Sequence, residues 1–167
     1  YFENWKSDIG TFTSSSAIYG ETKGAIDEKY NNFKPISNYG SMKLASETFL
    51  STYFNNYKAK IIIFRFPNVV GTNLTHGLLF DMKKKITSKN KNIMVLGNGS
   101  QQKPYSHVSE IIECMIYLKN KKYRNRLNYF NIGSNDKGIK VREIINMLVR
   151  SFKSNKKQFG IWPISVF

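Results

Sequence analysis

A short apolar run in the first half of the chain restricts the fold most. The run Ile61–Phe64 is uninterrupted and is bounded by the charged residues Lys60 and Arg65. An apolar run of this length with charged flanks is typical of a buried strand. It is far shorter than the roughly 18 residues that a membrane-spanning helix needs. We therefore predict a buried strand over residues 60–66.

Helix and strand patterns alternate along the rest of the chain. Residues 38–56 carry apolar residues at helical spacing, and Ser37, after Pro35, is suited to be the N-cap. Such alternation indicates an α/β fold with a largely parallel sheet. The other predicted elements are helices over 78–86, 108–118 and 141–152, strands over 93–96 and 129–132, a strand that ends in a polar turn within 10–20, a loop over 21–36 and a turn over 67–71.

Composition limits the class of protein. The chain has 167 residues and 41% hydrophobic residues, enough for a domain with a real core. Its single cysteine, Cys114, lies among apolar residues, so we expect it in the core and expect a reducing compartment. The first residues have neither the basic nor the apolar region of a signal peptide. These features predict a cytoplasmic protein without a membrane partner.

The formal net charge of +15 raises the question of an anionic partner. The lysines are spread along the chain in small clusters, and no zinc-finger spacing, helix-turn-helix signature or RNA-binding consensus occurs. We therefore predict no nucleic-acid partner. A basic surface that binds another anionic partner stays open as an alternative.

Tyr39 and Lys43 are the first candidates for chemistry. They stand four residues apart, which places them on one face of the predicted helix. A nearby ammonium group stabilises a phenolate, so such a pair suits acid/base work in a redox enzyme. The alternative is an ordinary half-buried tyrosine beside a solvated lysine.

Four further segments occur with this pair in a fixed order. They are Thr13-Ser14-Ser15-Ser16-Ala17-Ile18-Tyr19-Gly20, Arg65-Phe66-Pro67-Asn68-Val69-Val70-Gly71, Leu96-Gly97-Asn98-Gly99 and Lys103-Pro104-Tyr105-Ser106-His107-Val108. The ordered set resembles the extended short-chain dehydrogenase/reductase superfamily, and within it the NAD-dependent sugar-nucleotide epimerases and dehydratases. Residues 65–85 look most like the UDP-glucose 4-epimerase branch.

The resemblance implies an architecture. Residues 1–72 would be the second half of an NAD-binding Rossmann domain, with the C-terminal part of its parallel sheet and the catalytic residues. Residues 73–167 would mostly belong to a small α/β region that binds a nucleotide sugar and that is truncated at its C-terminal end. The family helix that corresponds to residues 39–56 often packs across a two-fold axis, so a homodimer is expected for the complete enzyme.

The resemblance also implies catalytic roles. Tyr39 would be the acid/base, and Lys43 would hold the nicotinamide ribose and stabilise the phenolate. Ser15 stands four residues before Tyr19, where the family places its catalytic serine or threonine, and would hydrogen-bond the sugar hydroxyl. In isolation, the serine run has the alternative of a turn that satisfies its own backbone.

Ligand-binding roles follow in the same way. The resemblance places Ser14, Phe66 and Pro67 with Tyr39 and Lys43 at the NAD site. Substrate-binding positions would be Ser15, Asn68, Leu78, Leu96, Lys103 and Tyr105, with core packing an equal alternative for the two leucines. Lys103 stands where the family usually has an arginine, and it supplies charge without the bidentate fork. His107 is expected to be structural.

The implied reaction is epimerisation at C4 of a UDP-hexose through a 4-keto intermediate. A dehydratase of this family would carry Asp-Glu after its catalytic threonine, whereas this chain has Ser16-Ala17. That difference favours epimerisation. The alternatives are another sugar-nucleotide-modifying reaction of the family (a dehydratase, decarboxylase or reductase), or a non-catalytic remnant that binds an anionic partner.

The sequence departs from the family pattern in two places. No glycine-rich phosphate-binding motif occurs, and in this fold it should precede residue 1. Near the other end, Ser165 stands where the family has an aspartate for the nucleotide. We therefore expect the chain to be a fragment that lacks the N-terminal glycine-rich half and is inactive alone.

Overall fold

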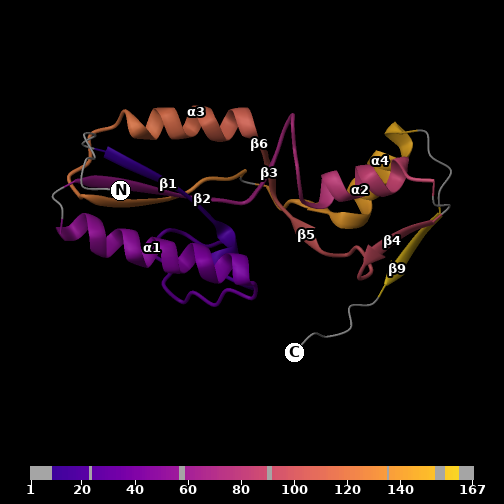
Figure 1. Ribbon diagram of the computed structural model, residues 1–167, viewed down its shortest axis with the longest axis horizontal. Coiled ribbons are helices and arrows are strands. Elements are labelled where there is room, and N and C mark those ends of the chain that lie inside the picture. Colours follow the sequence, from indigo (N-terminus) through magenta and orange to yellow (C-terminus); the bar gives the residue numbers. More distant parts are fainter. Residues whose placement is uncertain are drawn as a thin grey trace. The chain divides into compact units, whose positions relative to one another are not determined.

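The fold is described from a computed structural model (Figure 1). It describes residues 9–22, 24–56, 59–89, 92–134, 136–152 and 157–161. These fall into two compact units, one built from residues up to Val69 and from Ser106–Gly133, the other from Val70–Tyr105 and the residues after Gly133. Each unit is described separately below.

The first unit is built around a parallel sheet. Its strands are β1 (Ile9–Ser15), β2 (Lys60–Phe66) and β7 (Leu127–Asn131), in the order β1-β2-β7. Both neighbouring pairs are parallel. The predicted α/β class with a parallel sheet is therefore confirmed, and β2 has the predicted bounds.

Two helices cover the two faces of this sheet. Helix α1 (Asn38–Asn56) lies on one side and α3 (Val108–Lys119) on the other, as Figure 1 shows. Strand β2 supplies apolar side chains to both layers. Ile61 and Ile63 pack with Phe54 of α1, whereas Ile62 and Phe64 form a separate cluster that contains Ile111 of α3. A strand buried on both faces needs this uninterrupted apolar pattern.

The second unit has its own core. Helices α2 (Leu78–Thr87) and α4 (Val141–Ser151) pack with strand β4 (Asn92–Leu96), which pairs in parallel with β9 (Lys157–Ile161). Two short strands, β5 (Gln102–Lys103) and β8 (Ile139–Lys140), pair antiparallel. The buried side chains of this core are Met82, Ile86, Ile93, Val95, Val141 and Ile145.

Two short strands differ from the sequence-based expectation. The predicted turn over 67–71 is wrong at its centre, because β3 (Asn68–Val70) is a strand that pairs with β6 (Tyr105–His107). Pro67 and Gly71 are turn-forming residues, but partners distant in sequence determine such short strands. The segment 106–133 also groups with the first unit, whereas the predicted second region began at residue 73. The functional labels of the two predicted regions stay predictions.

Three further predictions concern the cysteine, membrane-spanning helices and the C-terminal residues. Cys114 packs beside the apolar cluster of Ile62 and Phe64, as expected. No helix in the described part of the chain is long and apolar enough to cross a membrane. Ser165 and the family-like residues after Ile161 lie outside the described residues.

Candidate active site

The carboxyl ends of β1 and β2 meet at one edge of the parallel sheet. Ser15 pairs in register with Phe66, and Ser14 pairs with Arg65. In open α/β sheets, ligands bind outside the carboxyl ends of the strands. The predicted residues Ser14, Ser15, Phe66 and Pro67 therefore lie at the edge where a ligand is expected.

The serine run has two different environments. Ser15 is the N-cap of the short 3₁₀ helix η1 (Ser16–Ile18), and its Oγ accepts the Ala17 N–H at 3.2 Å. The local backbone bond that offered an alternative role for Ser15 is therefore present. Ser14 is only 3% exposed, and its Oγ has no hydrogen-bond partner within the described residues. A buried hydroxyl without a partner can accept or donate a bond to a bound molecule.

Helix α1 begins directly against η1. Ser37 Oγ accepts the N–H of Gly40 at 3.1 Å, which confirms its predicted capping role. A Cβ on Gly40 would lie 2.5 Å from the Ala17 carbonyl oxygen and 3.0 Å from Pro35 Cβ. Only a glycine allows this approach without displacement. The absence of a side chain at residue 40 brings the first turn of α1, which carries Tyr39, against the turn that begins at Ser15.

Lys43 is held in place by β1. Its Nζ donates to the Thr13 carbonyl oxygen at 2.7 Å and lies 5.1 Å from the centre of the Phe12 ring. The same Nζ lies 5.7 Å from the centre of the Tyr39 ring. Tyr39 is 56% exposed, so its phenol is open to a ligand. The pair therefore combines an anchored cation with an accessible hydroxyl on one helix face.

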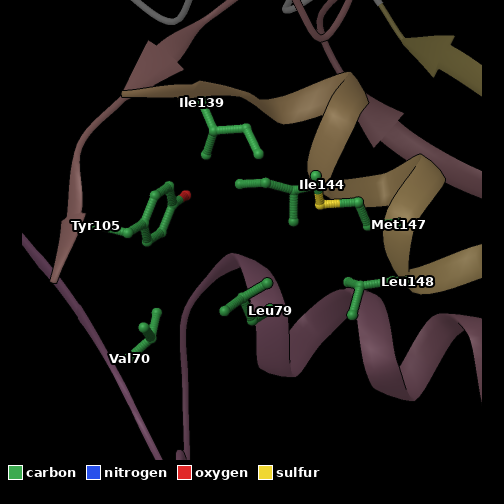
Figure 2. Close-up of a pocket in the computed structure, with 7 residues that line it drawn as sticks. All are labelled: Val70, Leu79, Tyr105, Ile139, Ile144, Met147 and Leu148. Carbon is green, nitrogen blue, oxygen red and sulfur yellow. The ribbon is translucent and has the colours of Figure 1, made fainter. Parts of the chain in front are cut away.

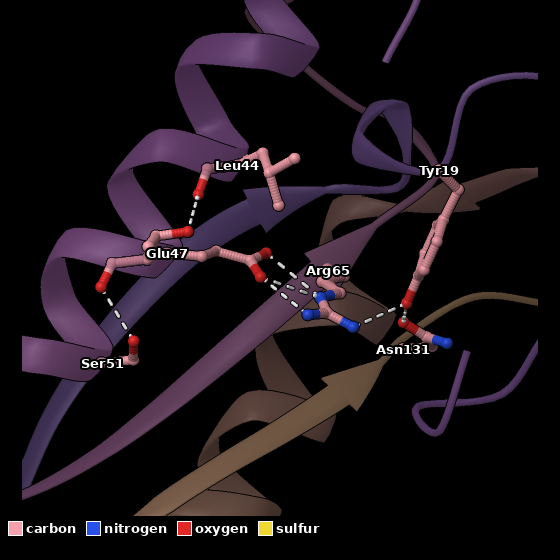
Figure 3. A network of polar contacts seen from close by, with 7 residues as sticks. Tyr19, Leu44, Glu47, Ser51, Arg65 and Asn131 are labelled. Atoms are coloured by element: carbon pink, nitrogen blue, oxygen red, sulfur yellow. Dashed lines mark hydrogen bonds and ion pairs between the residues drawn. The ribbon is translucent and has the colours of Figure 1, made fainter. Parts of the chain in front are cut away.

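A buried polar network lies behind this pair and was not predicted from the sequence. Arg65 forms an ion pair with Glu47 of α1 and donates to the Tyr19 hydroxyl, which in turn donates to Asn131 Oδ1 (Figure 3). Burial lowers the pKa of Arg65, but hydrogen bonding and attraction from Glu47 and Tyr19 raise it by more. The available signal was Arg65, a charged residue at the end of an apolar strand, whereas no sequence pattern singled out Glu47.

The residues from the end of β2 to the start of β3 are partly buried. The rings of Phe66 and Phe64 stack with their centres 6.3 Å apart. Pro67 lies against Gly133, where an added Cβ would come within 3.2 Å of the proline ring. Asn68, the first residue of β3, is half-buried. These positions are compatible with ligand contacts, but their roles stay predictions.

The remaining predicted substrate residues belong to the second unit. Tyr105 points into an apolar pocket of about 230 Å³ (Figure 2). Burial raises the pKa of its phenol. The other lining residues are Val70, Leu79, Ile139, Ile144, Met147 and Leu148. The exposed lining of this pocket is apolar throughout, so it suits an apolar surface of a ligand better than a charged group.

The other three predicted substrate residues of the second unit are not among the described residues that line this pocket. Leu78 packs against the core of the second unit, which favours the packing alternative for it. Lys103 in β5 is exposed. Leu96 ends β4, and its side chain lies outside the described residues. His107, as expected, has a structural contact, because its Nδ1 accepts the Ser109 N–H at the start of α3.

The first unit combines three features at the carboxyl end of its sheet. A parallel sheet presents a serine at the end of one strand, and the adjoining helix presents a tyrosine and an anchored lysine. The model of the NAD dependent epimerase/dehydratase family matches residues 9–133, three quarters of the chain. The chain belongs to this family.

Curated relatives include both branches of the family. dTDP-D-glucose 4,6-dehydratase of Mus musculus is 24% identical over 127 residues, which are 74% of this chain and 34% of that protein. A putative UDP-glucose 4-epimerase of Methanocaldococcus jannaschii is 24% identical over 140 residues, or 81% of this chain and 44% of that protein. The chain thus spans less than half of the length of these relatives.

Solved structures show the same fold. UDP-glucuronic acid 4-epimerase from Bacillus cereus, in complex with UDP-glucuronic acid and NAD, superposes with a TM-score of 0.85 at 23% identity. That match covers 98% of this chain and 51% of the epimerase chain. UDP-glucose 4-epimerase from Thermus thermophilus, in complex with NAD, gives 0.78 at 21% identity and covers 94% and 52%. At these identities, the likeness establishes the fold.

Proposed function

We propose that the protein containing this chain is an NAD-dependent enzyme that inverts C4 of a UDP-hexose through a 4-keto intermediate. The observation that carries the proposal is the arrangement at the carboxyl end of β1. There Lys43 Nζ is fixed 2.7 Å from the Thr13 carbonyl oxygen and 5.7 Å from the Tyr39 ring centre. An anchored cation and an exposed phenol therefore stand side by side at the end of the strand that carries Ser15.

Three residues of this chain have a defined part in the proposed reaction. Tyr39 takes the proton of the sugar 4-hydroxyl when C4 is oxidised, and it returns a proton when C4 is reduced. Ser15 hydrogen-bonds the same hydroxyl and keeps it within reach of the phenolate. Lys43 balances the phenolate charge and binds the hydroxyls of the nicotinamide ribose. The 4-keto sugar turns over between the oxidation and the reduction, so the reduction occurs on its other face.

The residues present fit the nicotinamide end of NAD. The exposed phenol of Tyr39, the anchored Lys43 and the buried Ser14 Oγ, which has no partner among the described residues, offer polar groups. Phe66 and Pro67 offer an apolar wall beside them. When bound, NAD supplies the hydride acceptor and donor for C4. The sequence has no glycine-rich loop for the pyrophosphate. This chain would therefore hold the reactive end of the cofactor and not its diphosphate.

The second unit is proposed to bind the nucleotide part of the substrate. The pocket beside Tyr105 is apolar and has a volume of about 230 Å³, which suits a planar base. Lys103 is exposed and could attract a diphosphate as a point charge. Leu78 and Leu96 stay predicted contacts of the nucleotide.

A dehydratase is the second candidate, because dehydratases are among the curated relatives at 24% identity. Removing water from C5 and C6 of a 4-keto sugar needs an acid and a base beyond the tyrosine. The η1 turn after Ser15 contains no acidic residue, since Ser16 and Ala17 occupy its first two positions. Neither side chain can serve as the acid or base of an elimination, so the site supports epimerisation better.

Product analysis separates these reactions. The full-length protein that contains this chain should convert UDP-glucose to UDP-galactose, or act likewise on the N-acetyl or uronic acid forms. The product should keep its mass, which nuclear magnetic resonance of the sugar and mass spectrometry detect. Loss of 18 mass units would indicate dehydration and contradict the proposal. The 167-residue chain assayed alone should show no turnover.

The assembly and location of the enzyme stay predictions. We expect a homodimer formed across α1, because Met42 and Phe49, seven residues apart on that helix, are 70% and 62% exposed. Large exposed apolar side chains on one helix face often mark an interface. We expect the dimer in the cytoplasm, with no nucleic-acid or membrane partner.

A further inference from the structure

Arg65 is buried, and each nitrogen of its guanidinium group has a hydrogen-bond partner. Its side chain is 4% exposed. Nε lies 3.1 and 3.2 Å from the two Glu47 carboxylate oxygens, and Nη2 lies 2.7 Å from Oε2. Nη1 donates to the Tyr19 hydroxyl at 2.8 Å. A guanidinium has a rigid planar fork, so these bonds specify the position of both partners.

Aromatic rings enclose the same cation. The guanidinium carbon lies 4.5 Å from the Tyr129 ring centre, 5.1 Å from that of Phe33 and 5.4 Å from that of Tyr19. Cation–π contacts of this kind favour a cation over the ring faces. Glu47 belongs to α1, Tyr19 ends η1, Phe33 lies in the loop before α1 and Tyr129 belongs to β7. One side chain of β2 therefore joins four other segments of the first unit, and Figure 3 shows its contacts with Glu47 and Tyr19.

Two of these segments carry the proposed catalytic residues. Tyr19 is the C-cap of η1, and Ser15 is its N-cap. Glu47 lies one helical turn after Lys43 and two turns after Tyr39, so all three share a face of α1. A shift of Glu47 would move the helix that carries Tyr39. A shift of Tyr19 would move the turn that begins at Ser15.

A buried ion pair is an inefficient way to gain stability alone. The cost of removing two charges from water offsets much of their attraction, and well-packed apolar residues often stabilise a core equally well. The alternative use of such a pair is to select one geometry. Here the pair lies directly behind the residues whose separation the reaction depends on.

We propose that Arg65 is a positioning residue that sets the separation between Ser15 and Tyr39. It acts through Tyr19 on one side and through Glu47 on the other, and it touches neither substrate nor cofactor. This inference rests on the proposed function for its kinetic consequence. Its structural consequence, the distance between Ser15 Oγ and Tyr39 Oη, can be measured whatever reaction the enzyme performs.

Two variants test the proposal in the full-length enzyme. Tyr19→Phe removes only the hydroxyl that links Arg65 to η1. The double variant Arg65→Met with Glu47→Leu replaces the ion pair by apolar groups. It should fold because it leaves no unpaired charge, whereas Arg65→Met alone leaves the Glu47 carboxylate buried without its partner. Ile62→Val is the matched control, because Ile62 is buried on the other face of β2. Thermal melts establish that each variant is folded.

We expect kcat to fall roughly 100-fold in the double variant and roughly tenfold in Tyr19→Phe, while KM changes less than about threefold, since a misplacement of about 1 Å costs that much in rate. Ile62→Val should lower the melting temperature without this split. Folded variants with the kcat of the parent would overturn the proposal. A general loss of stability with parallel changes in the control would do the same.

Crystal structures give the second readout. The Ser15 Oγ to Tyr39 Oη distance should differ between the parent and the double variant by more than roughly 0.5 Å, the tolerance of a productive site. Sites that superpose within that limit would overturn the positioning role. A parent enzyme without turnover on any UDP-hexose would reject the proposed function, and this distance would still decide the role of Arg65.

Discussion

The backbone of Gly40 lies against the carbonyl group of Ala17. A Cβ on Gly40 would come within 2.5 Å of that oxygen, so the first turn of α1 and the η1 turn touch through their main chains. This approach joins the segment that carries Tyr39 to the segment that begins at Ser15. It makes the candidate site sensitive to a single methyl group outside the reacting residues.

Gly40→Ala should therefore destabilise the protein. In an ordinary helix the change would be favourable by roughly 0.5–1 kcal/mol, because glycine loses more backbone entropy on folding. Here the new Cβ meets a backbone oxygen, and overpacking of this kind costs about 1–3 kcal/mol. Urea denaturation measures the result, with Ser41→Ala at the neighbouring exposed position as the control. An equal or higher unfolding free energy for Gly40→Ala would contradict the close contact.

Tyr39→Phe tests the acid/base role. The change removes one hydroxyl that is open to a ligand and leaves the ring in place. In the full-length enzyme we expect kcat to fall by roughly 10²- to 10⁴-fold, the usual worth of a general base. The dissociation constant of NAD should change little. Tyr117→Phe, on the exposed face of α3, is the matched control, and turnover retained by Tyr39→Phe would exclude the assigned role.

Lys43→Met tests the anchored cation. The substitution keeps the length of the side chain but removes the Nζ that bonds the Thr13 carbonyl oxygen. A hydrogen bond to a charged group contributes about 1.5–3 kcal/mol, so NAD should bind roughly 10- to 100-fold more weakly. Isothermal titration of the full-length enzyme measures this change. Lys83→Met on α2 serves as control, and an unchanged NAD affinity would argue against a ribose contact.

Tyr129 predicts a dependence of stability on alkaline pH. Burial and the Glu47 carboxylate raise the pKa of its phenol, and Arg65 offsets part of that rise. The folded state therefore keeps the phenol proton of Tyr129 to higher pH than the unfolded state, in which the phenol titrates at about pH 10. The contribution is fully present below that pH and is lost as pH rises through the folded-state pKa. Tyr129→Phe should flatten the fall in unfolding free energy between about pH 9 and 11.

The comparison for this prediction is made at two pH values. At pH 7 the phenol is protonated in both the folded and the unfolded state, so its ionisation adds nothing to the difference in stability between the parent and Tyr129→Phe. If the two proteins lose stability in parallel above pH 9, the phenol of Tyr129 is not responsible.

Regular elements with strong local signals were predictable from the sequence. Strand β2 and helix α1 have the predicted bounds, because the run Ile61–Phe64 marks the strand and the cap at Ser37 marks the start of the helix. The face of α1 was not predicted correctly, since Met42 and Phe49 of the predicted apolar stripe are exposed. The short strands β3 and β6 were missed, since two or three residues carry no period and depend on a distant partner. Residues 106–133 belong to the first unit because of contacts between segments distant in sequence, which a local sequence pattern does not show.

The candidate site was predictable only in part. The spacing of Tyr39 and Lys43 gives their shared helix face, and the structure adds the bond from Lys43 to Thr13. The network of Glu47, Arg65 and Tyr19 joins residues 18 to 46 positions apart, and no local pattern pairs them. A buried charge in an apolar strand was the one visible sign that a partner had to exist.

That buried charge also bears on how the sheet assembles. Strand β2 is apolar on both faces, so Ile61–Phe64 alone would tolerate a shift of one residue against its neighbours. Such a shift would turn Arg65 from Glu47 toward the layer of Ile62 and Phe64. Separating a buried pair costs about 3–5 kcal/mol, enough to exclude the shifted pairing. Arg65 therefore makes one alignment of an otherwise ambiguous strand far more favourable, an effect that acts during folding by discriminating against misaligned sheets.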